Sequence, residues 1–262
     1  MTLIQNLARQ RLQSGELSLG IGLRQARTVD IGKIMKTCGF DWLFIDMEHG
    51  SMSVNDTVQI SVAASDAGIT PIVRVPGFQH FHATRVLDGG AMGIVFPHVD
   101  SAEIAKELAN FCRYPPRGHR SVVGALPQID FSSIPVSEAA EAINDAILVV
   151  VMLESPEAIE NVDAIAAVEG VDVLLVGTGD LTMEMGIPGK VDSPRVVSAY
   201  EKVISACRAH GKYPGLGGVY QPDLMERYIG MGMRFILATN DLAMMMQAST
   251  QRASFLRNLS VA

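Results

Sequence analysis

"ILVVVMLESPEAIENVDAIAAVEGVDVLLVGTGDL", residues 147–181, contains two apolar runs joined by a helical segment. The runs at 147–153 and 171–176 are almost continuously apolar, which is typical of strands that are covered on both faces. Between them, Ser155 followed by Pro156 marks a helix start, because a hydroxyl caps the first turn and proline is tolerated at the first helical position. The stretch therefore predicts a strand–helix–strand unit.

The same pattern recurs along the chain. Six more apolar runs, separated by helical segments, lie at 17–23, 42–46, 70–75, 93–97, 213–219 and 234–238. Eight strands that alternate with helices predict an α/β fold, a (β/α)8 TIM barrel, and residues 1–262 are expected to form one barrel domain. The alternative is an open doubly wound sheet, but it expects a glycine-rich phosphate turn after the first strand, and "GIGLRQARTVD" matches that turn poorly.

Composition argues against several classes of protein. The chain has 262 residues, 48% hydrophobic and 19% charged, and its net charge of −7 without a Lys/Arg cluster argues against a nucleic-acid binder. We find no run of about 18 uncharged apolar residues that would predict a membrane span. Cys38, Cys112 and Cys207 lack disulfide or zinc-ligand spacing, so we expect a cytoplasmic protein. We also expect no targeting segment.

Titratable side chains gather where the predicted strands end. In a barrel, the residues just past the carboxyl ends of the strands share one rim, where active sites lie. Four strands deliver such groups to this rim: Asp46, Glu48, His49, Arg74, Glu154 and Asp180. A buried ion pair explains any one of them equally well, but such a pair needs only two groups. The whole set therefore favours a functional site.

The residue types at this rim indicate enolate chemistry. The carboxylates of Glu154 and Asp180 are hard oxygen ligands, suited to Mg2+, Mn2+ or a similar divalent ion with open positions for water and substrate. Beside such an ion, Arg74 would stabilise an oxyanion. His49 is suited to proton transfer, because imidazole exchanges protons near neutral pH.

Two further observations narrow that chemistry. In "VGTGDL", Gly177 and Gly179 would expose backbone N–H groups that can hold a carboxylate, although an ordinary turn explains this short motif equally well. No lysine falls at the carboxyl end of a predicted strand, where a Schiff-base aldolase needs one. Carbon–carbon chemistry at this rim would therefore depend on a metal.

Taken together, these residues resemble a known family. The matching stretches are "FIDMEHG" (44–50), "PIVRVPG" (71–77), "LDGGAMGIVFPHV" (87–99), "YPPRGHRS" (114–121) and residues 153–186, followed by a glycine-rich seventh strand. Over about residues 17–245 the chain is similar to the class II pyruvate aldolase family, which includes 4-hydroxy-2-oxoheptanedioate aldolase and 2-dehydro-3-deoxyglucarate aldolase.

The resemblance implies a metal-dependent aldolase built on a (β/α)8 barrel. Such an enzyme reversibly cleaves a 4-hydroxy-2-oxoacid to pyruvate and an aldehyde through a metal-bound pyruvate enolate, with Mg2+, Mn2+ or Co2+ as cofactor. It also implies a homohexamer, a trimer of dimers in which a C-terminal helix is exchanged between subunits. That exchange would make the apolar segment 242–262 an oligomerisation segment; packing under the barrel is the other explanation.

The resemblance also assigns roles to residues. The implied metal ligands are Glu154 and Asp180. Arg74 is expected to hold the pyruvyl oxygen and stabilise the enolate, and His49 to transfer protons.

Two carboxylates and a backbone segment complete the implied site. Asp46 and Asp88 are expected to lie near His49, to orient it and to favour its charged form. The backbone around Gly179 would receive the pyruvate carboxylate. The implied substrate-binding residues are Arg74, Gly177, Thr178, Gly179 and Asp180.

Three positions depart from the family's usual pattern. Met152 stands where the family usually has glutamine, Thr178 where it has proline, and Ser121 where it has glycine. Loss of the glutamine removes a polar group from beside the metal, and Thr178 is expected to loosen the carboxylate site. We expect metal and pyruvate binding to survive, with effects on aldehyde preference and rate.

Four other residues have less defined roles. Glu48 is expected only to hold its neighbours in place, and His98 either faces the rim or, as the favoured alternative, is a structural histidine. His119 and Arg120 either contact the distal groups of the aldehyde or lie in a solvated loop.

Two rival functions remain open. An acyl-CoA lyase of the citrate lyase β-subunit kind would use a related barrel, but it calls for basic residues that grip the CoA phosphates, and this acidic chain offers few. A non-catalytic barrel that serves as a binding subunit is the second rival. The presence of Glu154, Asp180, Arg74 and His49 together counts against it.

Overall fold

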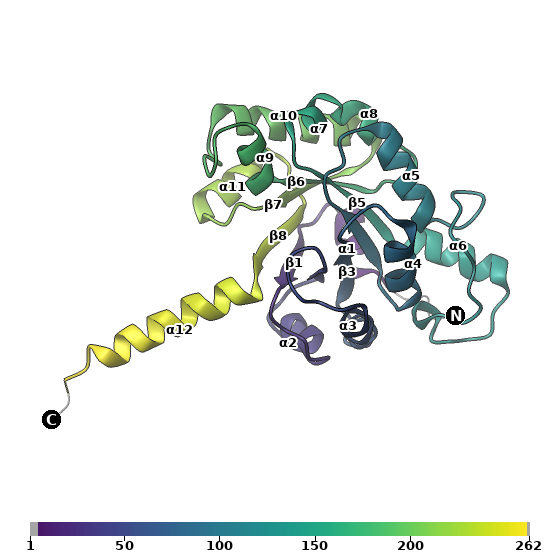
Figure 1. The fold of residues 1–262 in the computed structure, drawn as a ribbon, viewed down its shortest axis with the longest axis horizontal. Helices are drawn as coiled ribbons and strands as arrows, with labels where there is room; N and C mark the ends of the chain where they lie inside the picture. The colour runs from purple at the N-terminus through teal and green to yellow at the C-terminus, as the bar shows by residue number, and fades with distance from the viewer. Residues whose placement is uncertain (1–4, 261–262) are drawn as a thin grey trace.

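The computed structural model describes residues 5–260 and shows a closed barrel of parallel strands (Figure 1). The strands are β1 (Ser18–Leu23), β2 (Trp42–Asp46), β3 (Thr70–Arg74), β4 (Gly93–Phe96), β5 (Leu148–Leu153), β6 (Val173–Gly177), β7 (Tyr213–Gly217) and β8 (Phe235–Asn240). Each strand lies within two residues of its predicted range at either end. The predicted (β/α)8 barrel is confirmed.

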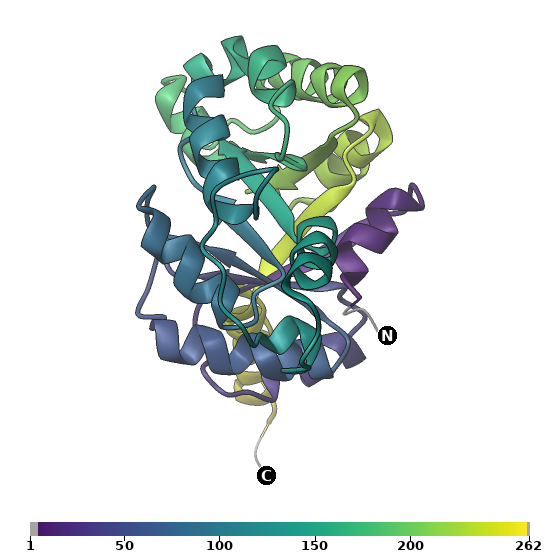
Figure 2. The same cartoon turned by 90° about the vertical axis from the view of Figure 1, so that its right-hand side faces the viewer.

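Helices surround the strands, as Figures 1 and 2 show from two directions. They are α1 (Leu7–Gln13), α2 (Ile31–Thr37), α3 (Val54–Asp66), α4 (His80–Asp88), α5 (Ala102–Cys112), α6 (Val136–Ala146), α7 (Pro156–Glu160), α8 (Val162–Ala166), α9 (Thr178–Glu184), α10 (Pro194–His210), α11 (Pro222–Met231) and α12 (Asp241–Arg257), with a 3-10 turn at Pro127–Ile129. The predicted cap at Ser155 is present, because its side chain accepts a hydrogen bond from the Ala158 N–H. Among the residues described, no helix combines the length and apolar character needed to cross a membrane.

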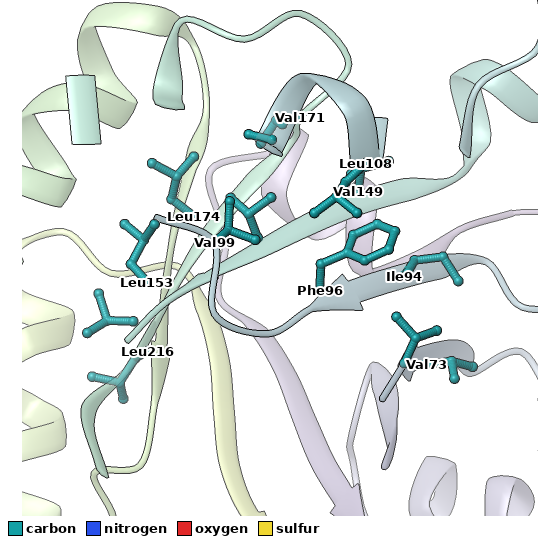
Figure 3. Packing of buried hydrophobic residues seen from close by; sticks show 14 of the residues in the cluster. Val73, Ile94, Phe96, Val99, Leu108, Val149, Leu153, Val171, Leu174 and Leu216 are labelled. Atoms are coloured by element: carbon teal, nitrogen blue, oxygen red, sulfur yellow. The ribbon is translucent and has the colours of Figure 1, made fainter. Parts of the chain in front are cut away.

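Neighbouring residues of each strand face opposite sides of the barrel wall. Ile72 packs inside the barrel, whereas Val73 packs in the outer layer between strands and helices. Figure 3 shows part of that outer layer, with Val73 near Ile94. Inside, the Trp42 indole stacks on the Phe235 ring. Glycine at position 20 leaves room for the indole, because a Cβ there would lie 2.1 Å from it. The interior is therefore a filled core and not a pore.

The first long connection, between β4 and β5, does not stay at the rim. After β4, α5 returns toward the amino ends of the strands, and Arg113 at its end donates a hydrogen bond to the carbonyl of Ile147, just before β5. The segment "YPPRGHRS" (114–121) follows Arg113, and the Arg120 N–H bonds the Arg113 carbonyl. This segment therefore lies near the amino ends of the strands, away from the rim where contact with the distal groups of the aldehyde was one expectation for His119 and Arg120.

The final helix, α12, leaves the barrel and has no buried residue (Figure 1). Several large apolar side chains in and after it are about half exposed: Met244, Met245, Met246, Phe255, Leu256 and Leu259. The alternative of packing under the barrel is therefore excluded for the described part of the segment 242–262; residues 261 and 262 lie outside the described residues. All three cysteines are free, with Cys38 exposed and Cys112 and Cys207 buried.

Candidate active site

Strand alternation brings three charged residues to the mouth of the barrel interior. Phe44, Ile72 and Met152 belong to the interior cluster, and the residues two positions further along face the same side. Those residues are Asp46, Arg74 and Glu154. All three are buried, with exposed fractions of 3%, 7% and 2%.

Asp46 holds Arg74 through a bidentate ion pair. The two residues are paired in register between β2 and β3, and Asp46 Oδ1 and Oδ2 accept hydrogen bonds from Arg74 Nε at 3.0 Å and Nη2 at 2.7 Å. The guanidinium also lies over the Phe44 ring, 5.1 Å from its centroid. This geometry fixes the plane of the cation at the top of the barrel.

The ion pair shifts the titration of its carboxylate. Burial raises the pKa of Asp46, but the hydrogen bonds and positive charge of Arg74, with the N–H groups of His49 and Glu48, outweigh burial, and the net pKa is lowered. Burial likewise lowers the pKa of Arg74, whereas Asp46 and Glu48 raise it more, so the guanidinium stays charged.

Glu48 lies at the centre of the site and contacts more of its residues than the expected supporting role required. One of its oxygens, Oε2, lies 2.8 Å from Arg74 Nη1 and 3.8 Å from His49 Nε2, and the other lies 3.5 Å from His98 Nε2. Asp46 contacts His49 only through the backbone N–H, at 3.2 Å. The carboxylate that faces the His49 ring is therefore Glu48 and not Asp46.

Glu154 is the most deeply buried of the site carboxylates. Its Oε2 accepts the His98 backbone N–H at 2.8 Å. Its other oxygen rests against Gly177, where a Cβ would lie 2.5 Å from Oε1, so a side chain at that position would displace the carboxylate. Burial raises the pKa of Glu154, and the negative charge of Asp180 adds to that rise.

His98 is a rim residue and not the structural histidine that the sequence suggested. Its side chain is 59% exposed, and its ring nitrogens lie 3.4 Å from Glu154 Oε2 and 3.5 Å from Glu48 Oε1. The sequence does carry a signal for this placement, because His98 follows β4 by two residues, as Glu48 follows β2. The resemblance assigns no catalytic role to either position.

The "GTGDL" segment forms the start of α9 and not a glycine turn. Neither Gly177 nor Gly179 has a positive φ, and α9 begins at Thr178. A Cβ on Gly218 would lie 3.0 Å from the Gly179 nitrogen, so glycine at 218 keeps space open beside the first N–H groups of the helix. The first N–H groups of a helix lack intrahelical partners and can bind a carboxylate, so the carboxylate site at this segment stays a prediction.

Thr178, which is expected to loosen the carboxylate site relative to proline, is held in this segment by two hydrogen-bonding contacts. Its fully buried hydroxyl lies 2.6 Å from both the Gly217 carbonyl and the Tyr200 hydroxyl, which ties α9 to β7 and α10. Met152, where the family usually has glutamine, places its sulfur 3.9 Å from Arg74 Nη1. A weak contact between this sulfur and Arg74 therefore takes the place of the contacts that a glutamine amide would make.

Asp88 lies away from this site, so the expectation that it orients His49 is wrong within one chain. Asp88 ends α4, five residues before β4 begins, at the amino ends of the strands, whereas His49 lies beyond the carboxyl end of β2. Its carboxylate pairs with Arg120 at 2.8 Å. The Arg120 side chain is fully buried there, and it does not reach the rim; His119 is exposed on the same loop.

The donor set at the rim fits a divalent metal ion. Glu154 and the exposed Asp180 would supply hard oxygen ligands, and Glu48 Oε2, although 2.8 Å from Arg74 Nη1, accepts no hydrogen bond from any residue described. Within residues 5–260 no group of three or more His, Cys, Asp or Glu side chains is arranged to hold a metal. A site with two protein ligands leaves other coordination positions for water and substrate.

Comparisons with known proteins agree with this arrangement. A family profile described as HpcH/HpaI aldolase/citrate lyase matches residues 25–248. Over 249 residues the chain is 42% identical to 4-hydroxy-4-methyl-2-oxoglutarate aldolase of Hapsidospora irregularis, covering 92% of this chain and 91% of that protein. It is 40% identical to the aldolase of the same name from Chaetomium globosum, with the same coverage. The crystal structure of an HpcH/HpaI aldolase from Desulfitobacterium hafniense superimposes with a TM-score of 0.91 at 30% identity, over 96% of this chain and 97% of that chain.

Proposed function

The chain belongs to the HpcH/HpaI aldolase/citrate lyase family and is an aldolase, a carbon–carbon lyase; within that class we propose that it cleaves a branched 4-hydroxy-2-oxoacid to pyruvate. The observation that carries the proposal is Arg74, fixed by Asp46 at the rim beside the carboxylates of Glu48 and Glu154. A fixed cation at this point suits the developing negative charge of a pyruvate enolate.

The proposed substrate is 4-hydroxy-4-methyl-2-oxoglutarate or a close analogue. The two most similar relatives described above carry that substrate in their names, at 42% and 40% identity. Retro-aldol cleavage of this compound between C3 and C4 releases two molecules of pyruvate, so the acceptor in the reverse reaction is a ketone. A simple aldehyde acceptor is then the less preferred substrate.

We assign the proton and charge steps to residues of the rim. His49 takes the proton of the C4 hydroxyl, the C3–C4 bond breaks, and its electron pair forms the enolate of pyruvate. Arg74 holds the enolate oxygen, and protonation at C3 then yields the second pyruvate. The N–H groups at the start of α9 around Gly179 receive the substrate carboxylate.

Glu154 and Asp180 would hold a divalent ion, for which we propose Mg2+, Mn2+ or Co2+. Such an ion would act as a Lewis acid toward the 2-oxo group. Burial and the nearby negative charge of Asp180 raise the pKa of Glu154, and a bound cation would offset both effects.

We also propose a homohexamer, a trimer of dimers in which α12 is exchanged between subunits. The exposed apolar side chains of α12 support an exchange, because they would otherwise remain in water. The three free cysteines are consistent with the proposed reducing, cytoplasmic setting.

Exchange of the pyruvate methyl protons with deuterated water tests the aldolase proposal. We expect exchange by the full chain with added Mg2+, Mn2+ or Co2+, slower exchange after chelation, and none in Arg74→Ala. No exchange with any of these ions would contradict the proposal. Release of pyruvate from 4-hydroxy-4-methyl-2-oxoglutarate but not from acyl-CoA thioesters then separates an aldolase from an acyl-CoA lyase, the alternative that the named relatives support less well.

A further inference from the structure

The backbone of His98 has an unusual conformation. Its φ is 52°, and in the described chain only Asp130 and Phe131 share a positive φ without being glycine. Those two residues lie in the turn after Pro127, far along the chain from the rim. A left-handed backbone is unfavourable for a residue with a Cβ and persists only where the surroundings impose it.

The surroundings of His98 fix this conformation from both sides. Pro97 precedes it with a restricted φ, and the Val99 N–H that follows donates to the Met152 carbonyl on β5 at 3.0 Å. Between these two constraints, the His98 N–H points at Glu154 Oε2, at 2.8 Å. The left-handed turn thus aims a main-chain donor at a buried carboxylate.

Glu154 has few other polar contacts. The second oxygen, Oε1, rests in the space that Gly177 leaves, and none of the residues described donates a hydrogen bond to it. The His98 ring touches the same oxygen as the main-chain N–H, with Nδ1 at 3.4 Å, but the side chain is 59% exposed. The main-chain bond is therefore the shortest and best-directed restraint on this carboxylate.

We infer that His98 is a positioning residue for Glu154. Its left-handed backbone holds one carboxylate oxygen and leaves the other without a hydrogen bond from the residues described, which favours metal binding. This inference rests on the proposed function, in which Glu154 is a metal ligand. It requires the backbone conformation at position 98 and does not require the imidazole ring.

A matched pair of variants separates the effect of the backbone conformation on metal binding from the effect of the ring. His98→Gly and His98→Ala both remove the ring, but only alanine disfavours the left-handed conformation. Mn2+ binding to each full-length protein is measured without substrate, from the electron paramagnetic resonance signal of free Mn2+. We expect Kd to change little in His98→Gly and to rise about threefold or more in His98→Ala, because histidine tolerates a positive φ several-fold better than alanine. His98→Asn is expected to restore tight binding, because asparagine tolerates this conformation.

Equal Mn2+ affinity of the glycine and alanine variants would overturn the inference. An equal loss in both would also overturn it, because the ring would then carry the effect, and so would absence of Mn2+ binding by the natural protein. Thermal unfolding by circular dichroism shows whether each variant is folded. If the natural protein binds Mn2+ but does not exchange pyruvate protons, the proposed function fails, and the comparison of Kd values still decides the role of His98.

Discussion

Glu48 Oε2 lies 2.8 Å from Arg74 Nη1, on a guanidinium whose Nε and Nη2 already bond Asp46. Two carboxylates therefore share one cation, and the trio carries a net negative charge. Glu48 also faces the His49 ring, at 3.8 Å. Glu48 therefore lies between Arg74, which would hold the enolate oxygen, and His49, which would move the proton.

Glu48→Gln is expected to slow the proton step while leaving pyruvate binding intact. Removing a negative charge beside Arg74 favours binding of an anion, so the KM for pyruvate should not rise. The His49 ring loses its nearest carboxylate, so kcat for methyl-proton exchange should fall about tenfold or more. Glu16→Gln, at an exposed ion pair, is the control. A higher KM with unchanged kcat would show that Glu48 serves binding alone.

Asp46→Asn is expected to destabilise the fold strongly. The Asp46 and Arg74 side chains are only 3% and 9% exposed, and removing one partner leaves a buried charge without its main counterion. We expect a loss of about 3 kcal/mol in the free energy of unfolding, measured by urea denaturation at pH 7. Asp163→Asn removes an exposed partner of His210 and should cost less than about 1 kcal/mol. Equal losses in the two variants would contradict this.

The same ion pair predicts a pH dependence. The folded-state pKa of Asp46 is lowered, because Arg74 outweighs the effect of burial, so the unfolded chain binds a proton more readily. The stability that Asp46 contributes is then fully present above its unfolded pKa of about 3.9, and it is lost as pH falls through the lower folded value. The stability difference between the natural protein and Asp46→Asn should stay constant from pH 7 to about 5 and shrink only below about 4. A difference that vanishes by pH 5 would refute this assignment.

Much of the site follows from the periodicity of the strands. Continuous apolar runs predicted all eight strands, because parallel strands buried on both faces do not alternate between apolar and polar residues. Counting two residues from Phe44, Ile72 and Met152 places Asp46, Arg74 and Glu154 inside the mouth of the barrel. That inference needs only the strand boundaries.

The remaining features depend on the path of the chain between strands. Asp88 and Arg120 lie in conspicuous motifs, but the return of α4 and α5 carries both to the amino ends of the strands, which no spacing reveals. The left-handed backbone of His98 arises from its contacts with β5 and is equally invisible in the sequence. Local patterns therefore predict the elements, and tertiary paths decide which motif residues meet.

Glu154→Gln is expected to abolish stabilisation by a metal while sparing the metal-free fold. Glu154 is 2% exposed, and an amide removes a buried charge yet still accepts the His98 N–H. Mn2+ at about one hundred times Kd should stabilise the natural protein by about 2.7 kcal/mol, or about 5–10 °C in Tm. The variant should show no such shift, whereas Glu157→Gln, on the exposed side of α7, should respond like the natural protein. Equal shifts in all three proteins would rule out Glu154 as a ligand.

The apolar end of α12 is expected to hold subunits together. Phe255 and Leu256 are 56% and 55% exposed, and no residue of α12 is buried within the chain. Replacing both with serine removes apolar area that a partner would cover, so the mass measured by light scattering during gel filtration should fall below that of the natural assembly. The barrel itself should unfold at an unchanged temperature when assembly is prevented by dilution, because neither side chain is buried within its own chain. Gln251→Ser, also on the exposed helix, should retain the natural mass. An unchanged mass in the double variant would show that α12 does not hold the assembly together.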